Sequence, residues 1–179
     1  MDDASAGRSE LLEHGPVGPP RRWSRRRWLA AVAVVALLAL ATAADRWVHA
    51  DEVRVARANL ALAQLTADHA DGLIQSTFQY SSPLIVSTRA SDQVRAGLRA
   101  LVMQSAADGA AELRAVRSSV TASRVLPWHG DVRRSREATL AFLDAKIAFL
   151  TAGSRDYNAL NVAPPEVAQA LDRARALSP

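Results

Sequence analysis

The stretch from Trp28 to Ala44, WLAAVAVVALLALATAA, contains no charged residue. Its length lies at the lower edge of the roughly 17–25 apolar residues that a helix needs to cross the hydrocarbon core of a bilayer. Asp45 ends the run, and Trp47 follows closely. Trp28 and Trp47 therefore bracket the run, as tryptophans anchored at the two membrane interfaces do. We predict a transmembrane helix over residues 28–47.

Basic residues gather on the N-terminal side of this run. By the positive-inside rule they place the N-terminus in the cytoplasm and residues 48–179 outside it. Residues 1–27 end in a Pro- and Gly-containing segment and a basic block, and we predict a disordered cytoplasmic tail there. The residues predicted to lie at a membrane interface are Arg25, Arg26, Arg27, Trp28, Trp47 and, by the argument given below, Trp128.

A cleaved export signal is the alternative interpretation of the same segment. Ala41-Thr42-Ala43 fits the small-x-small pattern that signal peptidase accepts. The segment Ser24-Arg25-Arg26-Arg27-Trp28-Leu29 resembles the twin-arginine export signal, although Trp stands at its aromatic position. We favour the uncleaved anchor because Trp47 sits where a second interfacial tryptophan belongs. Both interpretations place the C-terminal part outside the cytoplasm.

The remainder of the chain shows the periodicity of packed helices. Apolar residues recur at steps of three and four, which is the spacing of one buried helix face. The first series is Val53, Ala56, Leu60, Ala63, Ala67, Ala70 and Ile74, which Leu62, Leu65 and Leu73 widen. Because no Pro or Gly interrupts residues 29–71, we expect the membrane helix to continue to near Tyr80. Ser81-Ser82-Pro83 should then end it, since the residue before proline disfavours helix.

Three further helices are predicted after this break. Ser91 is a suitable N-cap for the second helix, which Pro127 ends, and Asp131 is the N-cap candidate of the third. A short fourth helix should cover residues 166–177. Within the second helix, Gly109 either costs stability or marks a close helix crossing. Without sustained period-two alternation, the sequence predicts an all-α fold: a single N-terminal transmembrane helix followed by an extracytoplasmic antiparallel bundle of three long helices plus one short helix.

Helix lengths predict where the connectors lie. Residues 46–80 rise about 50 Å as a helix, and residues 91–125 return over the same distance. The connector 126–130 should therefore come back to the membrane surface. One hypothesis puts Trp128 at the lipid interface with nearby arginines close to phosphates. The alternative makes Trp128 a cap of the bundle core, with the arginines in solvent. The arginines are Arg124, Arg133, Arg134 and Arg136.

Apolar residues also cluster at the opposite turn. Either they form an exposed patch that contacts a protein partner, or they fold inward and cap the bundle. The residues are Phe78, Tyr80, Leu84, Ile85 and Val86.

The sequence offers little that would support catalysis or a cofactor. Cysteine is absent, which excludes thiolate metal sites and Cys nucleophiles. His49-x-x-Glu52 reverses the Glu-x-x-His order of di-iron bundles and has no second pair, so we do not expect a metal site. Acidic and basic residues nearly balance after residue 45, which argues against a nucleic-acid-binding face. We therefore predict no enzyme activity, no cofactor and no nucleic-acid partner.

These observations predict a single-pass membrane protein that works by binding, as a scaffold or accessory subunit at a bacterial cell envelope. Its partners would be membrane lipid and either another protein or further copies of the chain. Three or four amphipathic helices can leave one apolar stripe uncovered, which favours such contacts. The second hypothesis is an exported soluble bundle that binds a small ligand between its helices.

Overall fold

The computed structural model describes residues 25–87 and 90–179, and every regular element within those ranges is a helix. This confirms the all-α prediction. The chain divides into two units, Met1–Ala44 and Asp45–Pro179. The elements in chain order are α1 (Arg25–Ile85), α2 (Asp92–Ala122), α3 (Gly130–Gly153), the short 3-10 helix η1 (Tyr157–Leu160) and α4 (Pro165–Ala176).

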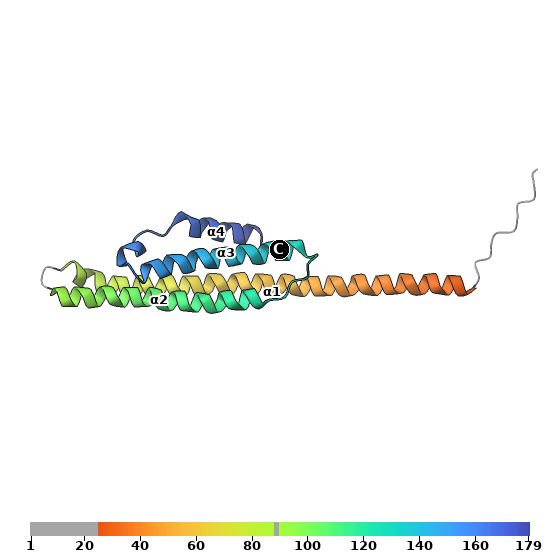
Figure 1. Ribbon diagram of the computed structural model, residues 1–179, viewed down its shortest axis with the longest axis horizontal. Coiled ribbons are helices and arrows are strands. Elements are labelled where there is room, and N and C mark those ends of the chain that lie inside the picture. Colours follow the sequence, from red (N-terminus) through yellow and green to blue (C-terminus); the bar gives the residue numbers. More distant parts are fainter. Residues whose placement is uncertain (1–24, 88–89) are drawn as a thin grey trace, which may run out of the picture. The chain divides into compact units, whose positions relative to one another are not determined.

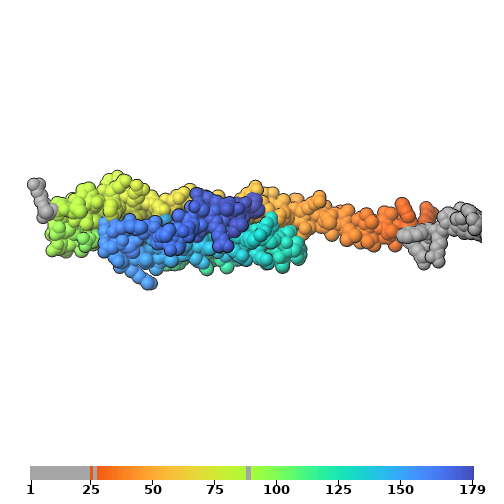
Figure 2. Space-filling model, turned by 90° about the horizontal axis from the view of Figure 1, so that it is seen from above, coloured from red at the N-terminus to blue at the C-terminus, as the bar shows by residue number. Residues whose placement is uncertain are grey.

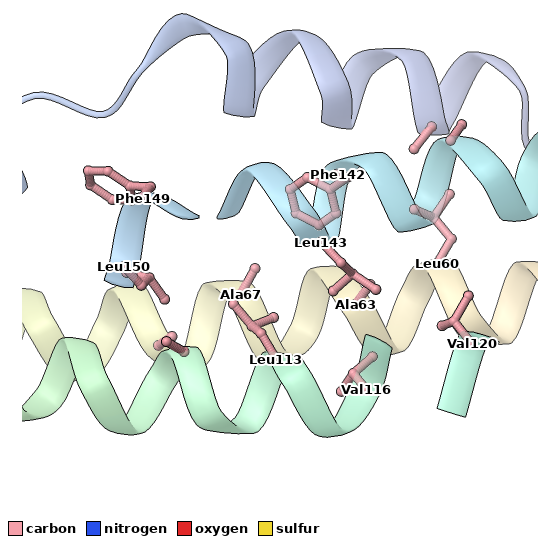
Figure 3. Close-up of a cluster of buried hydrophobic side chains, with 14 residues drawn as sticks. Leu60, Ala63, Ala67, Leu113, Val116, Val120, Phe142, Leu143, Phe149 and Leu150 are labelled. Atoms are coloured by element: carbon pink, nitrogen blue, oxygen red, sulfur yellow. The ribbon is translucent and has the colours of Figure 1, made fainter. Parts of the chain in front are cut away.

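The unit Asp45–Pro179 is a helical bundle. The part of α1 that belongs to it lies beside an antiparallel α2, α3 runs along both, and α4 packs on α3 (Figure 1). Figure 3 shows the core that these helices share. Its largest fully buried side chains include Leu113, Phe142, Leu143 and Leu150. Burial of this apolar surface is the main stabilising contribution to the bundle.

Alanines on α1 allow its neighbours to approach closely. Five positions of the series predicted from the sequence are buried: Ala56, Leu60, Ala63, Ala67 and Ala70. A Cβ added to Gly109 of α2 would lie only 2.7 Å from the Cβ of Ala70. Gly109 therefore marks a close crossing of α1 and α2, which confirms the second of the two roles considered for it.

The apolar face of α1 is narrower than the sequence predicted. Leu62, Leu65 and Leu73 are 43%, 68% and 38% exposed, so they do not widen the buried stripe. The reason is the number of helices: α2 and α3 cover only one side of α1. These three leucines lie off the buried face of α1 and stay partly exposed.

One of the two predicted N-caps is confirmed and the other is wrong. The hydroxyl of Ser91 accepts a hydrogen bond from Val94 N, so this N-cap is confirmed. His129, however, holds the N-cap position of α3, and Asp131 lies in the first turn instead. A carboxylate in that turn still interacts favourably with the helix dipole.

Ser81-Ser82-Pro83 does not end α1, contrary to the sequence prediction. Pro83 lies inside the helix, which continues to Ile85. Proline inside a helix removes one N–H donor and crowds the carbonyl four residues before it, yet here only two residues of α1 follow Pro83. The following turn is held by Val86 N, which donates to Ser82 O at 3.1 Å, and by the burial of Ile85.

The C-terminal segment lies on the outer face of the bundle (Figure 2). Val167, Leu171 and Leu177 pack against the core, and Ala174 is fully buried. Arg57 Nε of α1 donates to the carbonyl oxygen of Pro179 at 2.5 Å. The short fourth helix is therefore an integral part of the bundle. It begins and ends one residue earlier than predicted.

Candidate functional site

Two histidines and one glutamate meet where α1 faces the connector between α2 and α3. His49 and Glu52 are three residues apart on α1 and share one helix face. His129 comes from the connector. One potential donor atom from each of these residues lies within 4.8 Å of the other two. We call His49, Glu52 and His129 the His–Glu cluster.

Glu52 connects α1 to the connector through both of its carboxylate oxygens. Oε1 accepts a hydrogen bond from Leu126 N at 2.9 Å, and Oε2 lies 2.6 Å from His129 Nδ1. The side chains of Glu52 and His129 are only 10% and 7% exposed. Because a carboxylate only accepts, Nδ1 of His129 carries the hydrogen of the short bond.

The environment of His129 favours its protonated form. The hydrogen bond to Glu52 is the main cause that raises the pKa of His129 above its usual value near 6.5. Burial of the ring opposes this increase, while the negative charges of Glu52 and Asp45 add to it. His129 and Glu52 therefore form a charge-assisted pair between α1 and the connector.

The Nε2 atoms of the two imidazoles face different carboxylates. His129 Nε2 lies 3.4 Å from Asp45 Oδ1, and His49 Nε2 lies 3.4 Å from Asp131 Oδ2. The two imidazole rings are 4.5 Å apart in an edge-to-face arrangement. His49 Nδ1 and His129 Nε2 are buried and make no hydrogen bond within the described part of the chain.

Trp128 lies beside the cluster but is not part of the core. Its indole Nε1 donates to Asp45 Oδ1 at 2.8 Å, while 66% of the residue is exposed. The interpretation that Trp128 caps the bundle core is therefore wrong. The hypothesis of a lipid contact stays a prediction.

The arginines near this connector fall into two groups. Arg124, Arg133 and Arg134 are exposed. Arg136 instead donates to Val120 O at 3.0 Å and to Thr121 O, carbonyls at the end of α2. Arg136 therefore closes the C-terminus of α2 and is not free to contact a phosphate.

The predicted interface residues of the N-terminal part are described only in part. Arg25, Trp28 and Trp47 are exposed. The side chains of Arg26 and Arg27 lie outside the described residues, as does the predicted tail up to residue 24. The helix begins at Arg25, three residues before the predicted start.

The patch predicted at the opposite turn is mostly exposed. Tyr80, Leu84 and Val86 are 85%, 50% and 76% exposed, whereas Ile85 is buried. Phe78 stacks on Tyr157, with ring centres 6.1 Å apart. Ile85 is therefore a core residue, because it packs inward at the last turn of α1, and it cannot contact a partner.

Sequence reasoning found the His49-x-x-Glu52 pair but missed its partner. A di-iron bundle would supply a second pair from another helix, whereas His129 comes from a connector 77 residues after Glu52. The helix lengths could have indicated this contact, because a long helix and its antiparallel return place residues 126–130 beside residues 46–52.

Over the residues that the structure describes, the protein is all-helical, and one helix near its N-terminus is long and apolar enough to cross a membrane. No protein-family model matches the chain, and no curated protein or solved structure is significantly similar to it.

Proposed function

We propose that this protein is a single-pass membrane protein whose helical bundle lies outside the cytoplasm and works by binding. In this role it is a scaffold or accessory subunit at the cell envelope. The anchor would confine the bundle to the membrane and so raise its effective concentration near other membrane components.

The observation that carries this proposal is the complete exposure of the apolar part of α1. None of the apolar window in this helix is buried within the protein. Leu37, Leu38 and Leu40 are 66%, 62% and 67% exposed. Contiguous apolar surface of this kind is unfavourable in water and marks a membrane or protein contact. Arginines before the run favour an N-terminus in the cytoplasm.

The bundle supports a binding role better than a catalytic one. Its helices meet through alanine, leucine, valine and phenylalanine. Tyr80, Leu84 and Val86 are exposed at the end of α1, where an apolar patch suits a protein partner. Trp128, also exposed, lies next to the first residues after the apolar run, where a contact with lipid headgroups is expected.

Single cysteines test the proposed topology, because the chain contains none. Ala168→Cys introduces a thiol at an exposed position of α4, and Ser5→Cys introduces one in the N-terminal segment. A membrane-impermeant maleimide should label Ala168→Cys in intact cells. Ser5→Cys should react only after the cells are permeabilised. The opposite labelling pattern would refute the proposed orientation.

Intact-mass measurement separates the anchor from the alternative, an exported soluble bundle that binds a small ligand. Ala41-Thr42-Ala43 offers a cleavage site, and a signal sequence is as apolar as an anchor. For an anchor, the membrane fraction retains the full mass after carbonate washing. A soluble product lacking the residues up to Ala43 would favour the exported bundle.

A further inference from the structure

The His–Glu cluster shows the same arrangement twice. In each imidazole one nitrogen faces a carboxylate, and the other is buried and makes no hydrogen bond within the described part of the chain. His129 engages Glu52 through Nδ1, and its Nε2 makes no hydrogen bond, although Asp45 Oδ1 lies 3.4 Å away. His49 faces Asp131 through Nε2, and its Nδ1 makes no hydrogen bond. Histidine ligands of metals are held in this way, with a carboxylate on one nitrogen and the metal on the other.

The unpartnered nitrogens are unusual for this protein. Buried polar atoms almost always find a hydrogen-bond partner. Among the described residues, three buried side-chain atoms lack one, and the third is Ser135 Oγ. The other two belong to neighbouring imidazoles whose ring centres are 4.5 Å apart. A ligand that accepts electron pairs from both rings would satisfy both nitrogens together.

A carboxylate oxygen lies next to one of these nitrogens. Asp45 Oδ1 lies 3.4 Å from His129 Nε2. Ligand atoms of a tetrahedral zinc ion, with bonds of about 2.0–2.1 Å, are also roughly 3.4 Å apart. Asp45 is four residues before His49 on α1, and therefore shares its helix face.

We propose that His49, His129 and Asp45 bind a divalent transition-metal ion of the zinc type. The two imidazoles supply nitrogen ligands and Asp45 supplies an oxygen ligand, while Glu52 is a positioning residue that holds the ring of His129. The side chains of Asp45 and His49 are 47% and 37% exposed, which leaves an open route for the ion and a position for water.

The donor set decides the chemical class of the ion. Two imidazole nitrogens and one carboxylate suit zinc and its neighbours in the first transition series. Magnesium and calcium prefer sites made almost entirely of oxygen ligands. Because all three ligands belong to the unit Asp45–Pro179, the site does not depend on the membrane location proposed above.

Metal binding can be measured on the full-length protein in mild detergent, without a polyhistidine tag. After chelator treatment, the protein competes for zinc with a chromophoric chelator, and one ion per chain is expected. His49→Gln and His129→Gln each remove a ligand and should nearly abolish binding. Glu52→Gln should weaken binding about 10–100-fold, the usual cost of losing a carboxylate that orients a ligand.

Matched variants separate this site from nonspecific binding and from misfolding. His69→Gln changes an exposed histidine of α1 and should leave zinc affinity unchanged. Asp45→Asn keeps an acceptor for the indole of Trp128, so it should weaken zinc binding while circular dichroism stays unchanged. Zinc should also raise the melting temperature of the wild type but not of His129→Gln.

X-ray absorption at the zinc edge should show two imidazole ligands. The proposal is wrong if zinc, nickel and cobalt all fail to bind, or if affinity is the same in His49→Gln, His129→Gln and His69→Gln. Unchanged affinity in Asp45→Asn would overturn the assignment of Asp45 as a ligand.

Discussion

Glu52 Oε2 lies 2.6 Å from Nδ1 of His129, a residue 77 positions later in the chain. The same glutamate accepts the backbone N–H of Leu126. One buried carboxylate therefore fixes both the backbone and a side chain of the α2–α3 connector against α1. The ring of His129, held in this way, lies edge to face with His49 and 3.4 Å from Asp45.

The stability of the metal-free protein should depend on pH through His129. Glu52, Asp45 and Asp131 are the acidic groups around the two rings, and His49 is the other titratable one. Because the pKa of His129 is raised in the folded state, the stabilisation of the fold by protonated His129 is fully present below the unfolded pKa near 6.5. This stabilisation is lost as the pH rises through the higher pKa of the folded state.

Thermal melts in the presence of a chelator, from pH 5 upward, measure this dependence. In His129→Gln the slope should disappear, whereas His69→Gln should retain it. A wild-type protein that becomes more stable as the pH rises through this range would contradict the sign.

Gly109→Ala should destabilise the bundle although alanine is the better helix former. The new Cβ would lie 2.7 Å from the Cβ of Ala70 and 3.3 Å from Leu150 Cδ1. Ala70 cannot move without moving α1, so we expect a loss of about 1–3 kcal/mol, as for other overpacked cores.

Gly97→Ala is the matched control in the same helix. No atom lies within 4 Å of its added Cβ. The free energy of unfolding of this variant should therefore rise by roughly 0.5–1 kcal/mol from helix propensity alone. Chemical denaturation of both variants decides the matter. Equal effects at the two glycines would mean that α1 and α2 do not cross closely at Gly109.

Removing Lys146 and removing Asp71 should change the free energy of unfolding by different amounts. Lys146 Nζ lies 2.6 Å from both oxygens of Asp71, and only 6% of the lysine side chain is exposed against 52% of the aspartate. Asp71→Ala strands a buried ammonium and should cost about 1–3 kcal/mol.

Lys146→Met should be nearly neutral in the same measurement. The half-exposed Asp71 can be solvated by water, and methionine keeps the apolar contact that the lysine makes over the ring of Phe149. A larger loss in Lys146→Met than in Asp71→Ala would show that the aspartate, not the lysine, needs the pair.

Variants at the end of α1 should separate folding from partner binding. Ile85→Asp places a charge at a buried position and should lower the melting temperature clearly. Leu84→Asp, at a half-exposed position, should leave the melting temperature almost unchanged. If the patch binds a protein, Leu84→Asp should lose a partner that wild-type protein retains in a mild-detergent pull-down.

Leu65→Asp is the control for that pull-down, because Leu65 is exposed on α1 outside the patch. Retention of the partner by Leu84→Asp, or its loss from Leu65→Asp as well, would argue against a contact at the patch.

Much of the fold could be predicted from local patterns. The spacing of Ala56, Leu60 and Ala63 placed the buried face of α1 correctly, because a helix repeats its faces every three to four residues. Ser91 was identified as a cap from residue type alone. The errors at Pro83 and Asp131 came from helix ends, where burial of Ile85 and the position of His129 outweighed local preference.

The order of residues along the chain was enough to predict the all-helical class, the uncharged run and the four α-helices of the described part, though not the short helix η1. These features depend on short-range spacing and hydropathy. The order of residues could not establish that His129 pairs with Glu52, that Leu62 and Leu65 remain uncovered, or that Arg136 closes α2. Those contacts depend on which helix faces meet and on how the helices are shifted along their axes relative to one another. That arrangement is settled only when the whole bundle packs, since contacts between distant residues arise from all the helices together.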